Sequence, residues 1–324
     1  MRRSLPAVRR VAFLLLLVAC GSRTGLFVEG DEFTEIGPDD AGPDARRDGG
    51  RDADDLEDAP PPLDVRPPID VDRTDCPDAE ATLVYTITSS YDLQSFNPDT
   101  GQFNLIGKIS CPAPGGATPF SMAVDRRGVA YVQFTNERLY RVSTATAACI
   151  GTPYTPRQSN YGLFGMGFAT NSVGPTEALF VAGAGQARDG RPPAARGLAR
   201  ITPGTFDLTE IGDFVPAIAG AELTGTGDGR LFAFYSKQGE TSRSFIGEID
   251  TSTAQVVGER RFDTVDQGSG WAFAYWGGDF YMFHAPVGGT RVTRWRPSDD
   301  SVSIVATTPL TIVGAGVSTC APQQ

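Results

Sequence analysis

The sequence predicts an all-β protein, and three observations lead to that expectation. A turn rich in Pro, Thr, Asp and Ser recurs between two apolar positions seven residues apart, at intervals of 46, 59, 48 and 46 residues. The segments between these turns alternate apolar and polar residues, which is the period of a β-strand. No window holds a sustained 3.6-residue apolar period, so a helical fold is not expected.

The recurring turns indicate five repeats of four strands each. Their first apolar positions are Phe96, Val142, Ile201, Ile249 and Trp295. A period in the forties with hairpin turns is the signature of β-propeller blades. The remaining residues are too few for two further blades, so a seven-bladed ring is not expected. The longest interval has its surplus near residues 183–196, which we expect to form an exposed loop.

Each repeat should begin with an inner strand of small residues, because such strands crowd around a central axis. The first repeat lacks such a strand, for 82–87 already reads as its second strand, whereas 312–317 at the end of the chain has the same character. We therefore expect the C-terminal strand to complete the first blade and close the ring, which removes free sheet edges. The other candidate inner strands are 120–124, 164–168, 221–225 and 271–275.

Residues 1–19 have the features of a secretory signal peptide. Four arginines precede an apolar run at 11–19, which is too short to span a bilayer. The sequence Leu-Val-Ala-Cys at 17–20 resembles the bacterial lipoprotein signal, in which a Cys is acylated and becomes the mature N-terminus. This resemblance implies a lipid anchor on Cys20 and, with Gly21-Ser22 in place of an Asp, the outer membrane. An ordinary cleaved signal is the alternative.

Residues 20–79 should form a disordered tether. The stretch 29–80 holds 19 Asp or Glu against five Arg, and high net charge with few large apolar residues does not offset chain entropy by burial. Residues 81–324 are nearly neutral, with 20 acidic against 18 basic side chains. Neither part has the cluster of Lys and Arg that nucleic-acid binding requires, so no nucleic-acid partner is expected.

Two local motifs carry a family resemblance. The hairpin Asp125–Val132 reads Asp-x-x-Gly-x-x-Tyr-Val, and the turn Asn97–Gly101 reads Asn-Pro-Asp-Thr-Gly. Both resemble those of secreted bacterial propellers of the NHL and YncE kind. The whole arrangement of lipidation motif, acidic tether and propeller is similar to bacterial outer-membrane lipoproteins. These motifs are turn chemistry, so the resemblance implies a fold and a location and transfers no catalytic residue.

Four cysteines remain besides Cys20, an even number that favours two disulfides in an oxidising compartment. Cys76 precedes the first strand and Cys320 follows the closing strand, so closure of the ring would bring the two thiols together. Cys111 and Cys149 are then left as a second pair on adjacent blades. Free thiols are the alternative. A zinc site is not expected, because the chain has no close Cys pair and a single His.

The sequence offers no catalytic set and no cofactor motif. It has neither a Gly-x-Ser-x-Gly elbow nor a phosphate-binding loop, and nothing near His284 recommends it as a catalytic group. Glu222 is the only carboxylate within a predicted inner strand, whereas acid–base hydrolysis needs two. Phe120, Phe164 and Trp271 begin inner strands and, with Glu222, form the candidate ligand site at one mouth of the channel, suited to a sugar or a peptide. The alternative for these aromatic side chains is packing between blades.

We therefore expect residues 80–324 to form a five-bladed β-propeller on a lipid-anchored tether, facing the periplasm or the cell exterior. Its expected function is that of a non-enzymatic binding or interaction module with a sugar, peptide or protein partner. One alternative is a carbohydrate-active hydrolase that uses the channel. Another is a cell-envelope scaffold that binds a protein through its blade edges or the 183–196 loop. The fold does not decide among them, because propellers host binding and catalysis alike.

Overall fold

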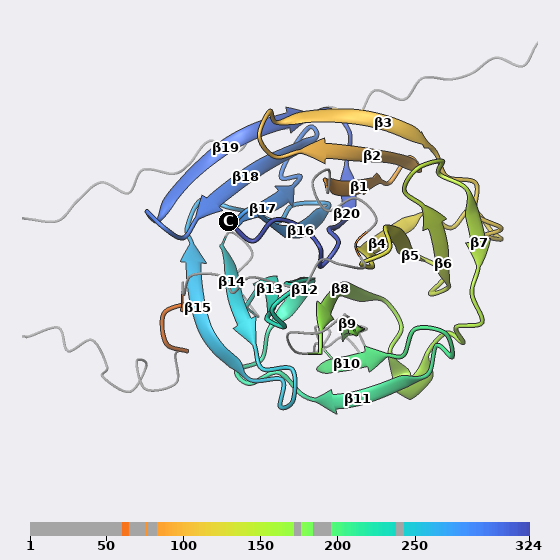
Figure 1. Cartoon of the computed structure of the whole chain (residues 1–324), viewed down its shortest axis with the longest axis horizontal. Helices are drawn as coiled ribbons and strands as arrows, with labels where there is room; N and C mark the ends of the chain where they lie inside the picture. The colour runs from red at the N-terminus through yellow and green to blue at the C-terminus, as the bar shows by residue number, and fades with distance from the viewer. Residues whose placement is uncertain (1–59, 65–75, 77–82, 172–175, 184–195, 238–242) are drawn as a thin grey trace, which may run out of the picture. The chain divides into compact units, whose positions relative to one another are not determined.

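The computed structural model describes residues 60–64, 76, 83–171, 176–183, 196–237 and 243–324. These residues form five antiparallel four-stranded sheets arranged as blades around a central axis (Figure 1), which confirms the predicted five-bladed β-propeller. The predicted signal peptide, Cys20, most of the tether and residues 184–195 of the expected loop lie outside the described residues. Within the part of the chain that is described, no helix has the length and hydropathy to cross a membrane.

Each blade runs from an inner strand at the axis to an outer strand at the rim. Blade 1 consists of β20 (Ile312–Gly316), β1 (Val84–Thr88), β2 (Asp92–Asn97) and β3 (Gln102–Lys108). Blade 2 consists of β4 (Pro119–Val124), β5 (Val129–Phe134), β6 (Leu139–Ser143) and β7 (Cys149–Gly151). Blade 3 follows a short 3-10 helix, η2 (Gln158–Asn160), and consists of β8 (Phe164–Thr170), β9 (Glu177–Gly183), β10 (Leu198–Ile201) and β11 (Leu208–Gly212).

The last two blades follow the same order. Blade 4 consists of β12 (Ala219–Gly225), β13 (Leu231–Ser236), β14 (Ser244–Ile249) and β15 (Val256–Phe262). Blade 5 consists of β16 (Trp271–Trp276), β17 (Asp279–His284), β18 (Thr290–Arg296) and β19 (Ser301–Thr308). The predicted inner strands at 120–124, 164–168, 221–225 and 271–275 are confirmed as β4, β8, β12 and β16.

The recurring turns of the sequence join the third strand of each blade to its outer strand. In the turn of blade 4, the Asp250 carboxylate accepts hydrogen bonds from the backbone N–H groups of Ser252 and Thr253 at 2.8 and 2.9 Å, the typical stabilisation of a turn by an Asx side chain. The Ala254 N–H then closes the turn on the Asp250 carbonyl at 2.9 Å. The turns share a positive φ at the equivalent position in every blade, at Gly101, Ala147, Phe206, Ala254 and Asp300.

The C-terminal strand closes the ring as predicted. Strand β20 pairs antiparallel with β1, with Gly314 opposite Ile87 and Gly316 opposite Tyr85. The two glycines lie against the next blade, because a Cβ at either position would come within 2.7 Å of a backbone nitrogen of β4. Small residues on this strand are therefore required by the contact between inner strands.

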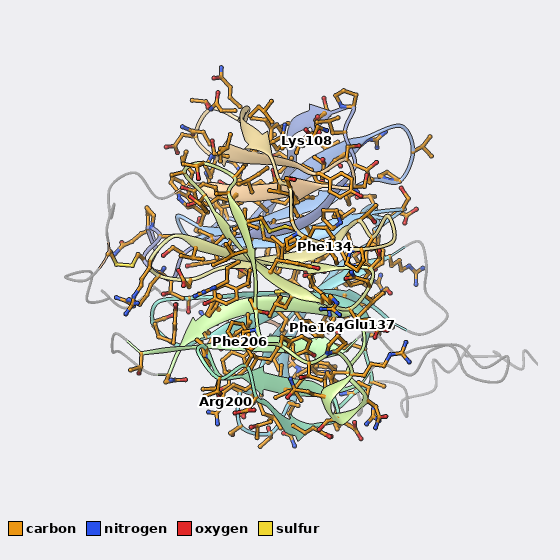
Figure 2. All side chains as sticks on the ribbon, turned by 90° about the vertical axis from the view of Figure 1, so that its right-hand side faces the viewer. Lys108, Phe134, Glu137, Phe164, Arg200 and Phe206 are labelled. Atoms are coloured by element: carbon orange, nitrogen blue, oxygen red, sulfur yellow. A yellow bond between two sulfur atoms is a disulfide. The ribbon has the colours of Figure 1, made fainter. Side chains whose placement is uncertain are left out.

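The core lies between the faces of neighbouring blades. Figure 2 shows side chains filling the molecule from one side to the other. Between blades 4 and 5, Phe280 stacks on Phe273 and Trp295 with ring centroids 5.6 and 5.3 Å apart. His284 is buried in blade 5, where its ring nitrogens lie 2.9 Å from the Asp266 carbonyl and 2.9 Å from the Thr293 hydroxyl. The single histidine is thus a satisfied core residue.

Residues 60–64 differ from the expectation of a disordered tether, because they lie along the outer edge of β15. The Leu63 N–H donates to the Glu259 carbonyl at 3.2 Å, and the Glu259 N–H donates to the Pro61 carbonyl at 2.7 Å. Proline content and charge predict disorder for a segment taken alone. They carry no information about an open sheet edge elsewhere in the chain to which the segment can pair.

Candidate functional site

Glu222 lies on inner strand β12 and is 4% exposed. Its Oε2 accepts a hydrogen bond from the buried Ser121 hydroxyl of β4 at 2.8 Å, and the carboxyl also accepts the backbone N–H of Met166 on β8. Burial raises the pKa of the Glu222 carboxyl well above its ordinary value. Three blades therefore meet at this one side chain, and its hydrogen-bonding capacity is directed to neighbouring inner strands.

The three aromatic candidates lie in different surroundings. Phe164 is fully buried, and its ring packs edge-on against Tyr154 with centroids 5.9 Å apart, inside the molecule in Figure 2. Phe120 and Trp271 are partly exposed. Trp271 lies against the backbone of β12, because a Cβ on Gly220 would be 3.2 Å from its ring. Phe120 and Trp271 are therefore partly accessible, whereas Phe164 packs between blades.

Below Glu222 the inner strands touch one another. A Cβ on Gly167 would lie 2.8 Å from the Leu223 carbonyl oxygen, and one on Gly225 would lie 2.2 Å from the Phe168 carbonyl oxygen. The space between these strands is lined mainly by apolar residues of blades 1 to 4 and has no room for a water molecule. At this level the channel is filled, so it offers no passage to a ligand.

The far mouth is covered by the C-terminal segment 317–324, which the sequence did not reveal. Thr319 and Cys320 are 1% and 2% exposed. The Pro322 carbonyl accepts the Gly277 N–H of blade 5 at 2.8 Å, and the Gln323 carbonyl accepts the Tyr275 hydroxyl at 3.2 Å. These two hydrogen bonds are to blade 5, and the Thr319 hydroxyl donates to Glu177 of blade 3, so the end of the chain is fixed across the ring.

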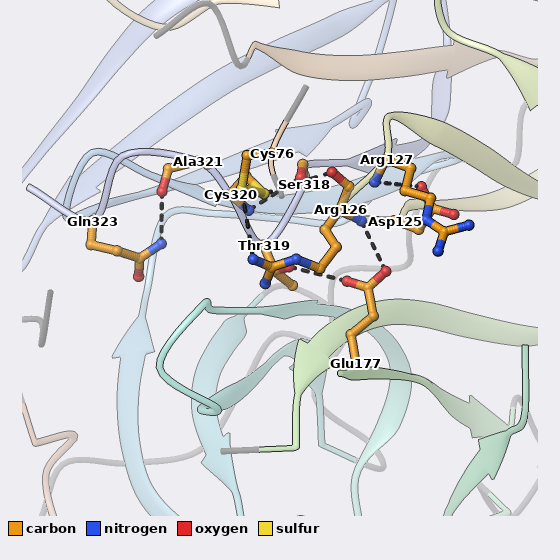
Figure 3. The surroundings of a disulfide bond; sticks show 10 residues. All are labelled: Cys76, Asp125, Arg126, Arg127, Glu177, Ser318, Thr319, Cys320, Ala321 and Gln323. Atoms are coloured by element: carbon orange, nitrogen blue, oxygen red, sulfur yellow. Dashed lines mark hydrogen bonds between the residues drawn. A yellow bond between two sulfur atoms is a disulfide. The ribbon is translucent and has the colours of Figure 1, made fainter. Parts of the chain in front are cut away.

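A carboxyl of blade 3 holds this segment in place (Figure 3). Glu177 accepts the Arg126 N–H at 2.9 Å with Oε1 and the Thr319 hydroxyl at 3.0 Å with Oε2. Burial raises the pKa of Glu177 to about 7, with the nearby Asp125 adding to the shift, although both hydrogen bonds favour the ionised form. Glu177 gave no signal in the sequence, because it lies at the start of an ordinary second strand.

Both predicted disulfides are present in the structure. Cys76 is bonded to Cys320 next to Glu177, with a Cα–Cα distance of 5.9 Å. Cys111, in the connection after β3, is bonded to Cys149 of β7, with a Cα–Cα distance of 5.0 Å. The first bond ties the residues ahead of blade 1 to the end of the chain, and the second ties blade 1 to the outer strand of blade 2.

A surface pocket of about 400 Å³ lies between blades 4 and 5 on the same side as the C-terminal segment, within the size range of small-molecule and peptide sites. Its lining includes the rings of Phe232, Tyr275 and Phe280, which pack on one another with centroids 4.8 to 6.1 Å apart. Its walls carry Arg230 and Arg296. We call this the wall pocket.

The charged groups of the wall pocket are held in fixed positions. Arg230 donates to both oxygens of Glu248, at 2.9 and 2.6 Å, and its guanidinium lies 4.7 Å from the centre of the Phe232 ring. Arg296 lies 3.2 Å from the Asp279 carboxylate. Paired arginines keep hydrogen-bonding capacity for carbonyl or carboxylate groups, and aromatic faces accept apolar groups or sugar rings. The arrangement can therefore bind a ligand that is partly apolar and partly polar.

A second pocket of about 410 Å³ lies between blades 3 and 4 and is lined mainly by polar groups, among them Arg200, Glu210 and Asp228. It lacks the cluster of three aromatic rings that lines the wall pocket. Among the residues that the structure describes, no group of three or more His, Cys, Asp or Glu side chains is placed to hold a metal ion.

Comparison with known proteins finds only distant structural similarity. No protein-family model matches the chain, and no curated protein matches its sequence. A chain in the crystal structure of a nidogen/laminin complex has 11% identity and a TM-score of 0.45, over 75% of this chain and 99% of that one. TolB from Acinetobacter baumannii has 15% identity and a TM-score of 0.41, over 72% of this chain and 55% of that one. Similarity this low transfers neither activity nor partner.

Proposed function

We propose that the chain is a lipid-anchored β-propeller of the bacterial cell envelope that acts as a non-enzymatic binding module. The observation that carries the proposal is the contrast between a filled channel and the open wall pocket. A ligand cannot pass along the axis, whereas the wall pocket offers aromatic faces and two positioned arginines. The ligand class that fits these groups is a peptide segment of a protein partner.

The two disulfides support the proposed location. Disulfides persist in oxidising compartments such as the bacterial periplasm and the cell surface. They agree with export directed by residues 1–19 and with anchoring through Cys20 on an acidic, proline-rich spacer. We place the protein at the outer membrane on the basis of the lipoprotein-like sequence.

The hydrolase alternative requires a carboxylate that is accessible and has a partner. Glu222 is buried, and its oxygens accept hydrogen bonds from Ser121 and Met166, which supports a role in joining the inner strands. The hydrolase would instead be established by three results together. The wild type would release reducing sugar from envelope polysaccharides, Glu222→Gln would lose this activity, and Ser121→Ala would retain it.

Selection from a displayed peptide library tests the binding module. Ser298 is exposed and lines the wall pocket, so Ser298→Trp should fill it. Ser303→Trp, at an exposed position on outer strand β19, is the matched control. We expect selected peptides to bind the wild type and the control alike and to bind Ser298→Trp at least about tenfold more weakly, a loss of about 1.4 kcal/mol. Peptides that bind all three proteins equally but lose affinity in Phe120→Ala would place the site at the channel mouth and refute the proposal.

A further inference from the structure

The outer edge of blade 4 carries a segment of the same chain from far along the sequence. Pro60–Asp64 runs parallel to β15, with Pro62 opposite Glu259. Glu259 uses both of its backbone groups here, accepting from Leu63 and donating to Pro61. An open sheet edge offers a row of unpaired N–H and C=O groups, and adding an extended segment to it is a general mode of peptide binding.

The edge is shaped for close approach at one residue. A Cβ on Gly258 would lie 3.1 Å from the Leu63 Cα and 3.2 Å from the Pro62 carbonyl oxygen. Gly258 is buried beneath the segment, whereas Val257 beside it is 43% exposed. A larger side chain at position 258 would therefore hold the segment away from β15.

The docked segment is also bound beyond its hydrogen bonds to Glu259. Arg230 donates to the Asp64 carbonyl at 2.7 Å while it remains paired with Glu248. The Leu63 side chain packs against the apolar cluster between blades 4 and 5 that includes Phe232. One apolar side chain and three backbone groups of the segment are thus recognised.

The segment contacts the backbone of Glu259 and not its carboxylate, because the carboxylate is already bound by other side chains. The Glu259 carboxylate accepts hydrogen bonds from the Tyr235 hydroxyl and from Lys237 Nζ, the latter at 2.8 Å. Prolines in the segment lack an N–H, so the only segment donor that reaches β15 is that of Leu63. The contacts therefore select an extended backbone with a leucine after the prolines.

We propose that this edge is a peptide-binding site for an extended segment of the Pro-Pro-Leu-Asp type, and that Pro60–Asp64 is its resident occupant. The proposal rests on the proposed function and deepens it, because Leu63 and Asp64 also line the wall pocket. The edge therefore continues the wall pocket, and the resident segment indicates the sequence of the partner peptide. A segment tethered to its own site acts at an effective concentration in the millimolar range. A peptide from a partner protein must displace it, so the resident segment sets a threshold for binding.

The test uses a fluorescent peptide with the sequence of residues 58–66 and measures anisotropy with full-length proteins. In one protein, residues 60–64 are replaced by Gly-Ser-Gly-Ser-Gly, which empties the edge and keeps the chain length. We expect the peptide to bind this protein with a Kd below about 0.1 mM and to bind the wild type at least about tenfold more weakly, because the resident segment competes at an effective concentration of about 1 mM. A peptide with Leu63→Asp should not bind either protein.

Further substitutions in the Gly-Ser protein locate the site. Gly258→Val should abolish peptide binding, and Val257→Ala should leave it unchanged. Thermal melts verify that each variant is folded, and Gly258→Ala takes the place of Gly258→Val if the latter does not fold. Absence of peptide binding to the Gly-Ser protein, or equal binding to the Gly258 variant, overturns the proposal. Loss of binding in Ser298→Trp but not in the Gly258 variant would overturn the edge site and leave the wall pocket standing.

Discussion

Removal of the closing strand should prevent the protein from folding. A chain that ends at Thr311 lacks β20 and the segment across the far mouth. It loses the buried side chains of Ile312, Ala315 and Val317, which are 0 to 5% exposed. At about 1.5 to 3 kcal/mol for each large apolar side chain, this loss is roughly 4 to 7 kcal/mol.

Loss of the bond between Cys76 and Cys320 adds to this effect. The two residues are 244 positions apart, and the chain-entropy relation gives roughly 5 kcal/mol for a loop of that length. The combined loss is about 10 kcal/mol, which lies within the usual total stability of a domain, about 5 to 15 kcal/mol. The truncated chain should therefore show no cooperative thermal transition and should aggregate through the exposed edge of β1.

A matched truncation separates the strand from the disulfide. A chain that ends at Val317 keeps β20 and loses Cys320, so it should still melt cooperatively, with a Tm lowered by about 10 to 20 °C. Circular dichroism and calorimetry on both truncated proteins give the answer. If the chain that ends at Thr311 melts within a few degrees of the full-length protein, the ring is not closed by its C-terminus and the reasoning fails.

Three further predictions concern the anchor, the tether and the far mouth. Cys20→Ser should release the protein from the membrane fraction into the soluble fraction, and persistence of the variant in outer membranes at high salt would mean that lipid is not the anchor. Limited proteolysis should remove residues ahead of Pro60 before the propeller is cut, and recovery of a protected fragment from residues 21–59 would contradict the predicted disorder. The pKa of Glu177 is raised to about 7 from 4.5, so its stabilising contribution is fully present below about pH 4.5 and is lost as the pH rises through 7, by roughly 3 kcal/mol. Glu177→Gln removes this titration. In urea unfolding, the free energy of unfolding of the variant relative to that of the wild type should therefore rise by roughly 3 kcal/mol between about pH 4.5 and about pH 8. A difference between the two proteins that does not change with pH would count against the burial of this carboxyl.

The fold was predictable because its determinants are repeated and local. One turn beginning at an apolar residue such as Phe96 or Ile249 recurs in every blade, and its side-chain hydrogen bonds lie within a few residues. The closing strand and the pairing of Cys76 with Cys320 followed from the count of strands. Each of these inferences needs only the order of elements along the chain.

The binding surfaces were not predictable in the same way, because they depend on contacts between blades. The Phe164 side chain could point to the channel mouth or between blades, depending on the face of β8 on which it lies. The small residues that follow it in the sequence do not indicate that face. The wall pocket combines Arg230 of blade 4 with Asp279 of blade 5, and neither residue belongs to a motif. Pro60–Asp64 is polar and proline-rich, which gives no sign of a docked segment. The need for glycine at position 258 becomes apparent only in the structure, where Pro60–Asp64 lies against it.

The central claim is that the protein binds its partner on the wall between blades 4 and 5 and not in the channel. Hydrogen–deuterium exchange of the wild-type protein, free and saturated with the tightest peptide from the library selection, tests this most directly. We predict slower exchange on binding in residues 228–236, 273–281 and 294–299, with no change in 119–124 or 164–170. Protection confined to those two inner strands would place the ligand in the channel and contradict the claim.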